Sequence, residues 1–124
     1  MGFPEILASY NSLHGGALVD LRERDERRLT LALRGELDMK ASNDLTPLLE
    51  SAVLDCPPKG RLILDLSLVN YISSTGVGLL STVLVKAEKR AVFLVLLDMP
   101  PRIRNIMETL GLLTYFTEEK SSRE

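Results

Sequence analysis

The feature that most constrains the fold is a strand–helix–strand pattern in the second half of the chain. Two apolar runs, residues 61–66 and 91–97, have the length and the Leu, Ile and Val content of strands buried on both faces. Between them, residues 75–89 place apolar side chains at helical spacing. Such a crossover is right-handed in nearly all proteins and makes its two strands parallel. The pattern therefore predicts a βαβ unit.

The two ends of the chain add a hairpin and a further helix. Residues 17–21 and 29–33 are β-prone runs on either side of a mixed-charge stretch, which predicts a hairpin with a solvated turn. The sheet is therefore expected to be mixed, because hairpin strands are antiparallel. A helix is expected to open at Pro100-Pro101 and to stop at Gly111, with a short edge strand in residues 112–116.

Between the hairpin and the βαβ unit, leucines at helical spacing predict another helix. Its start is ambiguous: Ser42 could cap it early, but Pro47 fits best at the first helical position with Thr46 as the cap. Residues 67–74 are expected to form a turn.

The length predicts a single domain. A chain of 124 residues can bury a core of its own, so we expect one domain over residues 1–124. Residues 1–16 are expected to be a loose N-terminal segment and residues 118–124 a frayed tail.

Charge and cysteine content exclude several function classes. A net charge of -2 gives no electrostatic reason for binding nucleic acid. The single cysteine, Cys56, cannot form an internal disulfide, which favours the reducing cytoplasm. The N-terminus lacks the pattern of a secretory signal, and no apolar run has the ~20 residues of a membrane helix, so no membrane insertion is expected.

Three consecutive hydroxyl residues, Ser73, Ser74 and Thr75, stand where a helix follows a buried strand. Side-chain oxygens at this position can accept hydrogen bonds from the first helical turn, and the helix dipole favours an anion there. A phosphate on one hydroxyl would add about -1.5 to -2 charges without opposing the fold. The alternative is purely structural: one hydroxyl caps the helix, while Gly76 and Gly78 permit close packing.

The hydroxyl segment is one of three stretches that carry a resemblance: Gly35-Glu36-Leu37-Asp38, Leu64-Asp65-Leu66-Ser67 running on through Gly78, and Pro101-Arg102-Ile103 through Leu110-Gly111-Leu112. In this order and spacing the chain resembles the anti-sigma factor antagonists, which are members of the STAS domain family. The resemblance implies an α/β fold, a mixed sheet of about four to five strands with about three to four helices packed mainly on one face.

The same resemblance implies a bacterial partner-switching cycle with Ser74 as the phosphorylated residue. The partners would be an anti-sigma factor with serine kinase activity, which binds the unphosphorylated form, and a PP2C-type phosphatase. No cofactor and no metal are implied. The residues expected to contact the partner are Gly35, Glu36, Leu37, Asp38, Ser73, Ser74, Thr75, Gly76, Val77 and Leu79.

One position departs from the family pattern. The family usually has an Asp immediately before the phosphorylated serine, and this chain has Ser73 there. The departure keeps open a second hypothesis, a constitutive STAS accessory subunit of a transporter or a signalling scaffold. A small nucleotide or lipid ligand has only the helix N-terminus in its favour.

An enzyme is not expected. The only histidine, His14, lies in the N-terminal segment, far in sequence from Ser74 and Cys56, so no nucleophile has an evident base. One His and one Cys are too few for a typical zinc site. The chain also lacks a Gly-rich phosphate-binding motif.

Overall fold

Alternating leucines build the two central strands of the sheet. The structure is a computed structural model that describes residues 3–13 and 19–121. Strand β2 (Arg28–Leu37) and strand β3 (Arg61–Ile72) lie side by side and parallel. Leu29, Leu31 and Leu33 of β2 are buried on one face, as are the leucines at 62, 64 and 66 of β3. These leucines form the centre of the core.

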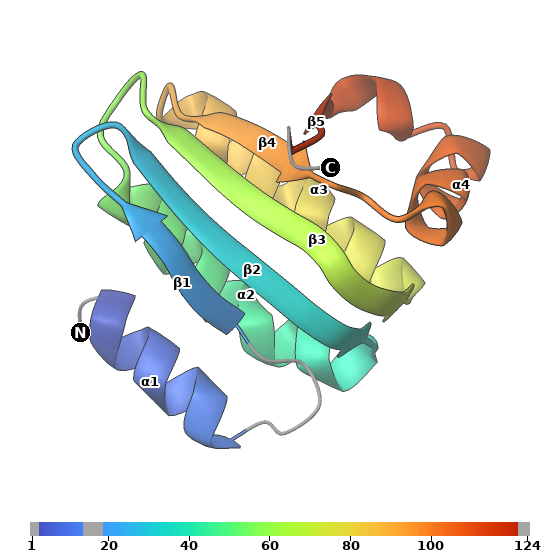
Figure 1. Ribbon diagram of the computed structural model, residues 1–124, viewed down its shortest axis with the longest axis horizontal. Coiled ribbons are helices and arrows are strands. Elements are labelled where there is room, and N and C mark those ends of the chain that lie inside the picture. Colours follow the sequence, from blue (N-terminus) through green and yellow to red (C-terminus); the bar gives the residue numbers. More distant parts are fainter. Residues whose placement is uncertain (1–2, 14–18, 122–124) are drawn as a thin grey trace.

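Five strands make one mixed sheet in the order β1-β2-β3-β4-β5. Strand β1 (Val19–Arg24) is antiparallel to β2, which confirms the predicted hairpin. Strands β4 (Phe93–Leu97) and β5 (Thr117–Glu119) continue the sheet in parallel. The parallel pairing of β3 with β4 through a helix confirms the predicted βαβ unit (Figure 1).

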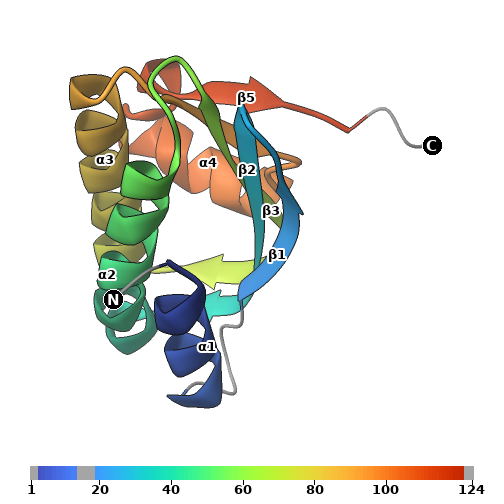
Figure 2. The same ribbon diagram turned by 90° about the vertical axis from the view of Figure 1, so that its left-hand side faces the viewer.

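The main helices lie together on one face of this sheet. Helices α2 (Met39–Asp55) and α3 (Ser74–Lys89) cover that face, and helix α4 (Pro101–Thr109) sits beside β3 (Figure 2). In the part of the chain that the structure describes, the opposite face carries no helix. The predicted edge strand at 112–116 is wrong, because a 3-10 turn (Leu113–Tyr115) occupies this segment and β5 begins two residues later than Tyr115.

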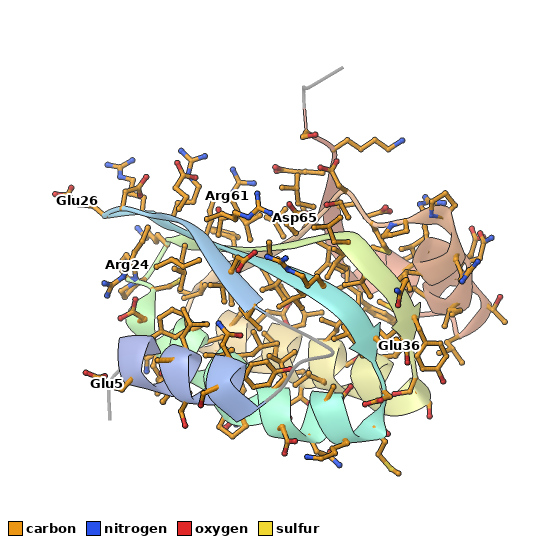
Figure 3. The ribbon with its side chains drawn as sticks, turned by 60° about the horizontal axis from the view of Figure 1, so that its bottom comes forward. Glu5, Arg24, Glu26, Glu36, Arg61 and Asp65 are labelled. Atoms are coloured by element: carbon orange, nitrogen blue, oxygen red, sulfur yellow. The ribbon has the colours of Figure 1, made fainter. Side chains whose placement is uncertain are left out.

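Charged side chains cover the helix-free face. Arg61 and Asp65 point away from the helices on this side of the sheet (Figure 3). Arg61 pairs with Glu119 of β5, and Arg34 pairs with Asp20 of β1. Ile63 and Val95 on this face are buried between such side chains, but Phe93, the neighbour of Arg61 on β4, is 62% exposed, so the face presents mixed charge and one aromatic ring to solvent.

The described part of the N-terminal segment differs from the loose state expected for residues 1–16, of which residues 1–2 and 14–16 lie outside the described part of the chain. Residues Phe3–Leu13 form helix α1, which packs against α2. Phe3 and Tyr10 are buried in the core cluster, and the side-chain amide of Asn11 exchanges two hydrogen bonds with the backbone of Val19. Apolar burial therefore holds the segment against the domain.

Helix α2 begins much earlier than predicted. Asp38 is its N-cap, with the carboxylate accepting a hydrogen bond from the backbone N–H of Ala41 at 2.8 Å, and Pro47 lies inside the helix. Proline removes the hydrogen bond to the carbonyl four residues back. Pro47 and Asn43 are both exposed, so water can satisfy that carbonyl and the helix continues through the proline.

Strand β3 continues where residues 67–74 were expected to turn. The ladder with β2 runs to the pair Leu37 and Ile72, with two irregularities in register on the way. Gly35 lies at the second of these with a φ of 87°, a conformation that glycine adopts without steric cost. Cross-strand pairing therefore overrides the turn-like composition of this segment.

Two features of the described residues bear on function. No described helix has both the length and the apolar character that crossing a bilayer requires. Within the same residues, no group of three or more His, Cys, Asp or Glu is placed to hold a metal ion.

At the C-terminus, β5 includes Glu118 and Glu119 of the tail expected to fray, while residues 122–124 lie outside the described part.

Candidate functional site

Ser73 is the N-cap of helix α3 and also a tie to strand β2. Its hydroxyl oxygen accepts a hydrogen bond from the backbone N–H of Gly76 at 3.1 Å and donates to the carbonyl of Leu37 at 3.0 Å. The backbone N–H of Ser73 donates to the same carbonyl at 2.9 Å, and the buried Ser42 hydroxyl lies 3.3 Å from it. Both donor and acceptor functions of the Ser73 hydroxyl are thus engaged within the fold.

Gly76 brings α3 close to the end of β2. A Cβ added at this position would lie 2.7 Å from Cγ1 of Ile72, 3.0 Å from the Leu37 carbonyl oxygen and 3.1 Å from the Ser42 hydroxyl. A larger side chain at residue 76 would separate the helix from both neighbours. The structural interpretation of Ser73 and Gly76, as cap and close contact, accounts for both residues.

Ser74 is neither the N-cap of α3 nor a link between α3 and β2. It is the first residue of α3, and its side chain is exposed. The half-buried Thr75 follows. Ser74 therefore presents a hydroxyl at the positive end of a helix where an enzyme in solution can reach it.

The segment Gly35–Asp38 lies directly beside the hydroxyl cluster, which consists of Ser73, Ser74 and Thr75. Its position at the end of a strand predicts this. Leu37 is the cross-strand partner of Ile72, and Glu36 that of Tyr71. Glu36 is exposed at this end of β2, opposite the end that carries Arg24 and Glu26 (Figure 3). The exposed Asp38 combines a surface position with its role as the cap of α2.

Several residues expected to contact the partner are buried instead. Leu37, Val77 and Leu79 are 1%, 2% and 6% exposed, and Gly76 is buried as well. Val77 and Leu79 are buried because α3 packs against both α2 and the sheet. The surface that remains around Ser74 consists of Glu36 and Asp38, with the half-buried Gly35, Ser73 and Thr75.

Residues of α4 also border Ser74, which sequence reasoning missed. Asn105, Ile106 and Thr109 of α4, together with its C-cap Leu110, line a shallow hollow with Ser74. Their spacing along one helix face was visible in the sequence, but nothing there indicated which element this face would meet.

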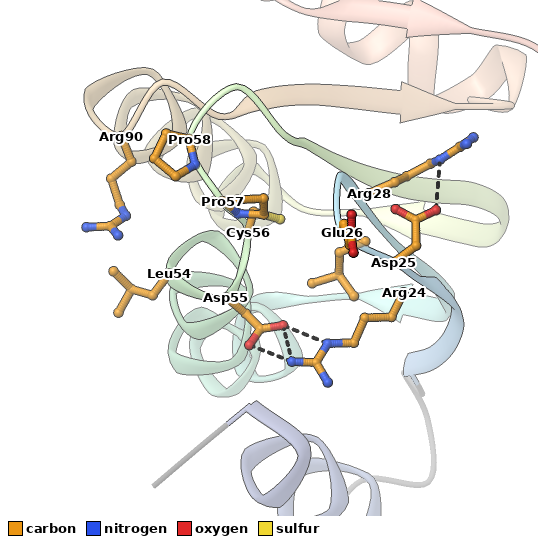
Figure 4. Close-up of a pocket in the computed structure, with 11 residues that line it drawn as sticks. Arg24, Asp25, Glu26, Arg28, Leu54, Asp55, Cys56, Pro57, Pro58 and Arg90 are labelled. Carbon is orange, nitrogen blue, oxygen red and sulfur yellow. Dashed lines mark hydrogen bonds and ion pairs between the residues drawn. The ribbon is translucent and has the colours of Figure 1, made fainter.

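A larger hollow of about 720 Å³ lies at the other end of the sheet, near Cys56 (Figure 4). The guanidinium of Arg24 donates two hydrogen bonds of 2.9 Å to the carboxylate of Asp55, so the charges here largely neutralise each other. Burial, reinforced by the negative charge of Asp55, raises the pKa of the Cys56 thiol to about 11. Cys56 is therefore a protonated, unreactive thiol at neutral pH. His14 lies outside the described residues.

Known proteins resemble this chain in family and in fold. The sequence matches the family model of the STAS domain over residues 19–124. Among curated protein sequences none matches this chain.

Solved structures share the fold at low sequence identity. An anti-sigma factor antagonist from Mycobacterium paratuberculosis is 23% identical, with a TM-score of 0.73 over 86% of this chain and 88% of that one. The anti-sigma factor antagonist SpoIIAA in its unphosphorylated form is 21% identical, with a TM-score of 0.68 over 85% and 89%. Phosphorylated SpoIIAA of Bacillus is 20% identical, with a TM-score of 0.65 over 85% and 92%. This chain has the SpoIIAA-like α/β fold and belongs to the STAS domain family.

Proposed function

We propose that this chain is an anti-sigma factor antagonist of the bacterial cytoplasm whose binding is switched by phosphorylation of Ser74. The observation that carries the proposal is the difference in surroundings between two adjacent serines. Ser73 has its hydroxyl engaged as cap and tie, whereas Ser74 is exposed at the helix N-terminus. A protein partner, not a substrate, is the proposed ligand, and we assign no catalytic residue.

The proposed partner is an anti-sigma factor that is also a serine kinase. In the modifying step, the Ser74 oxygen forms a bond to the γ-phosphorus of ATP, the bond between that phosphorus and the β–γ bridging oxygen breaks, and ADP and the hydroxyl proton leave. A PP2C-type phosphatase reverses the modification by hydrolysis, which releases inorganic phosphate. The dianion adds about -1.5 to -2 charges at the docking surface.

The local charge explains why this addition would act on binding. Glu36 and Asp38 are exposed next to the hydroxyl cluster, so the phosphate joins an acidic rim. Repulsion of an acidic partner surface, or desolvation of the dianion against an apolar one, lowers affinity without unfolding the domain. The phosphate itself is compatible with the helix N-terminus.

The direct test is phosphopeptide mass spectrometry on the protein isolated from its native cell. The proposal predicts phosphate on Ser74 and none on Ser73. The kinase responsible, once purified, should bind wild type and Ser74→Ala but bind Ser74→Asp much more weakly. Equal binding by Ser74→Ala and Ser74→Asp would contradict the switch and favour a constitutive STAS subunit.

A further inference from the structure

Helix α1 lies outside the domain that the family shares. The family match begins at residue 19, whereas α1 ends at Leu13. Figure 1 shows α1 alongside α2 and opposite to it in chain direction, so the C-terminal end of α1 lies towards the start of α2. This chain therefore adds to the shared domain a helix that extends to the first turns of α2.

Two adjacent residues fix the C-terminal end of α1. The side-chain amide of Asn11 donates to the carbonyl of Val19 at 2.8 Å and accepts from its N–H at 3.1 Å, as a neighbouring strand would. Tyr10 is 4% exposed and belongs to the core cluster. Burial, and then the nearby carboxylates of Asp44 and Asp38, raise the pKa of this tyrosine to about 12. Tyr10 therefore lies close to the first turns of α2, which carry both carboxylates.

The first turns of α2, residues 39–46, depend on such contacts more than the later turns do. Pro47 has no N–H, so the carbonyl of Asn43 lacks its helical hydrogen bond, and this segment is joined to the later turns by one bond fewer. A helical segment this short is not stable by itself and is held by tertiary packing. Residues 39–46 are therefore the part of α2 that should open most readily.

This segment also holds one side of the surface beside the hydroxyl cluster. Asp38 caps α2 by accepting a hydrogen bond from the N–H of Ala41 at 2.8 Å. The buried Ser42 hydroxyl lies 3.3 Å from the Leu37 carbonyl, which also accepts from Ser73. Opening of residues 39–46 breaks both contacts, so the exposed Asp38 keeps its place only while the segment is closed.

We propose that α1 is a strap for the first turns of α2. Residues 39–46 open as a unit separate from the rest of the domain, and they do so only when the end of α1 at Tyr10 and Asn11 is released. Because Asp38 caps this unit, the strap also holds the acidic side of the surface beside Ser74. The consequence for partner binding rests on the proposed function, whereas the strap itself does not.

Hydrogen exchange of the full chain, followed by mass spectrometry, tests the strap. Asn11→Ala removes both hydrogen bonds to Val19 and leaves the core side chains in place. Ser12→Ala is the matched control, because Ser12 is exposed and its hydroxyl donates to the Ser9 carbonyl within α1. Ile103→Val is the second control: it removes a methyl group from a fully buried side chain of α4, and so lowers overall stability away from α1. Urea unfolding verifies that each variant is folded.

In Asn11→Ala, the amides of residues 39–46 should exchange about tenfold faster than in wild type, as the loss of two ordinary hydrogen bonds predicts. In Ser12→Ala and Ile103→Val, their exchange should stay within about twofold of wild type, because neither change releases the end of α1. Pro47→Ala restores the missing N–H, so it should slow exchange in the same segment by about tenfold.

Three results would overturn the strap. Equal acceleration in Asn11→Ala and Ile103→Val means that residues 39–46 open only when the whole domain unfolds. Unchanged exchange in Asn11→Ala means that they open while α1 stays bound, and unchanged exchange in Pro47→Ala removes the reason for a separate unit. All of these are measured on the protein alone, so a failure to find phosphate on Ser74 would end the proposed function and leave the strap standing.

Discussion

Replacing Ser73 with alanine removes two hydrogen bonds at the junction of β2 and α3. The N–H of Gly76 loses its cap, and the carbonyl of Leu37 loses the hydroxyl donor. Losing an N-cap costs ~1 kcal/mol, within a range of about 0.5–2. The second bond adds about 0.5–1 kcal/mol, because the Leu37 carbonyl keeps the N–H of residue 73 at 2.9 Å and is not left unpaired. We expect a total loss of about 1.5–2 kcal/mol.

Two matched variants isolate the cause. Ser73→Asp retains an acceptor for the Gly76 N–H and adds a favourable charge at the helix N-terminus, but it cannot donate to the Leu37 carbonyl when ionised. It should therefore be destabilised less than Ser73→Ala. Ser81→Ala removes a hydroxyl that donates to the Val77 carbonyl at 3.1 Å within α3, and it should change stability by less than about 0.5 kcal/mol.

Urea unfolding followed by circular dichroism measures these differences. With a slope of about 1.5 kcal/mol/M, the expected loss in Ser73→Ala moves the midpoint down by about 1 M. The reasoning is refuted if the midpoint of Ser73→Ala lies within the error of wild type, or if Ser81→Ala is equally destabilised. Either result would mean that the Ser73 hydroxyl is not a stabilising tie.

Three further predictions concern stability. Gly76→Ala should destabilise the protein by about 1–3 kcal/mol, because the added Cβ meets Ile72. Gly78→Ala should stabilise it by about 0.5–1 kcal/mol, because nothing lies within 4 Å of the added Cβ. Urea unfolding of both variants checks this pair, and similar free energies of unfolding for the two would contradict the packing. Ala91→Gly should raise the thermal midpoint, since Ala91 directly follows Arg90, the C-cap of α3, at a φ of 58°, and a glycine there relieves about 1 kcal/mol of strain; an unchanged or lower midpoint counts against it. Burial first, and then nearby carboxylates, raise the pKa of Cys56 to about 11 and that of Tyr10 to about 12. The unfolded chain therefore ionises first, so the free energy of unfolding should fall between about pH 9 and pH 12, less steeply in Cys56→Ala; a constant value from about pH 9 to pH 11 would refute this.

The sequence predicted the elements whose burial pattern is local. The runs that became β3 and β4 are apolar throughout, and the helix between them has its own spacing and a hydroxyl cap. The sequence did not show which element each apolar helix face would pack against. Val77 and Leu79 were assigned to a docking surface, but they are buried because α3 is covered by the sheet and by α2 at once.

Two errors had readable signals. Phe3, Ile6, Leu7 and Tyr10 follow helical spacing, which is the pattern of α1, and all four contact the core. Pro47 was taken as a helix start because proline is common there, although Asp38 provided an earlier cap. The extension of β3 had no such signal, since it depends on pairing with a strand distant in the sequence.

Helix α1 has a practical consequence for anyone who shortens this protein. The family match begins at residue 19, so a chain trimmed to it would lack α1 altogether. Trimming would uncover the apolar side of α2 that Phe3 and Tyr10 now seal. An exposed apolar patch of this kind promotes self-association, and an experimenter would then take the product for a natural oligomer or for a complex with a binding partner.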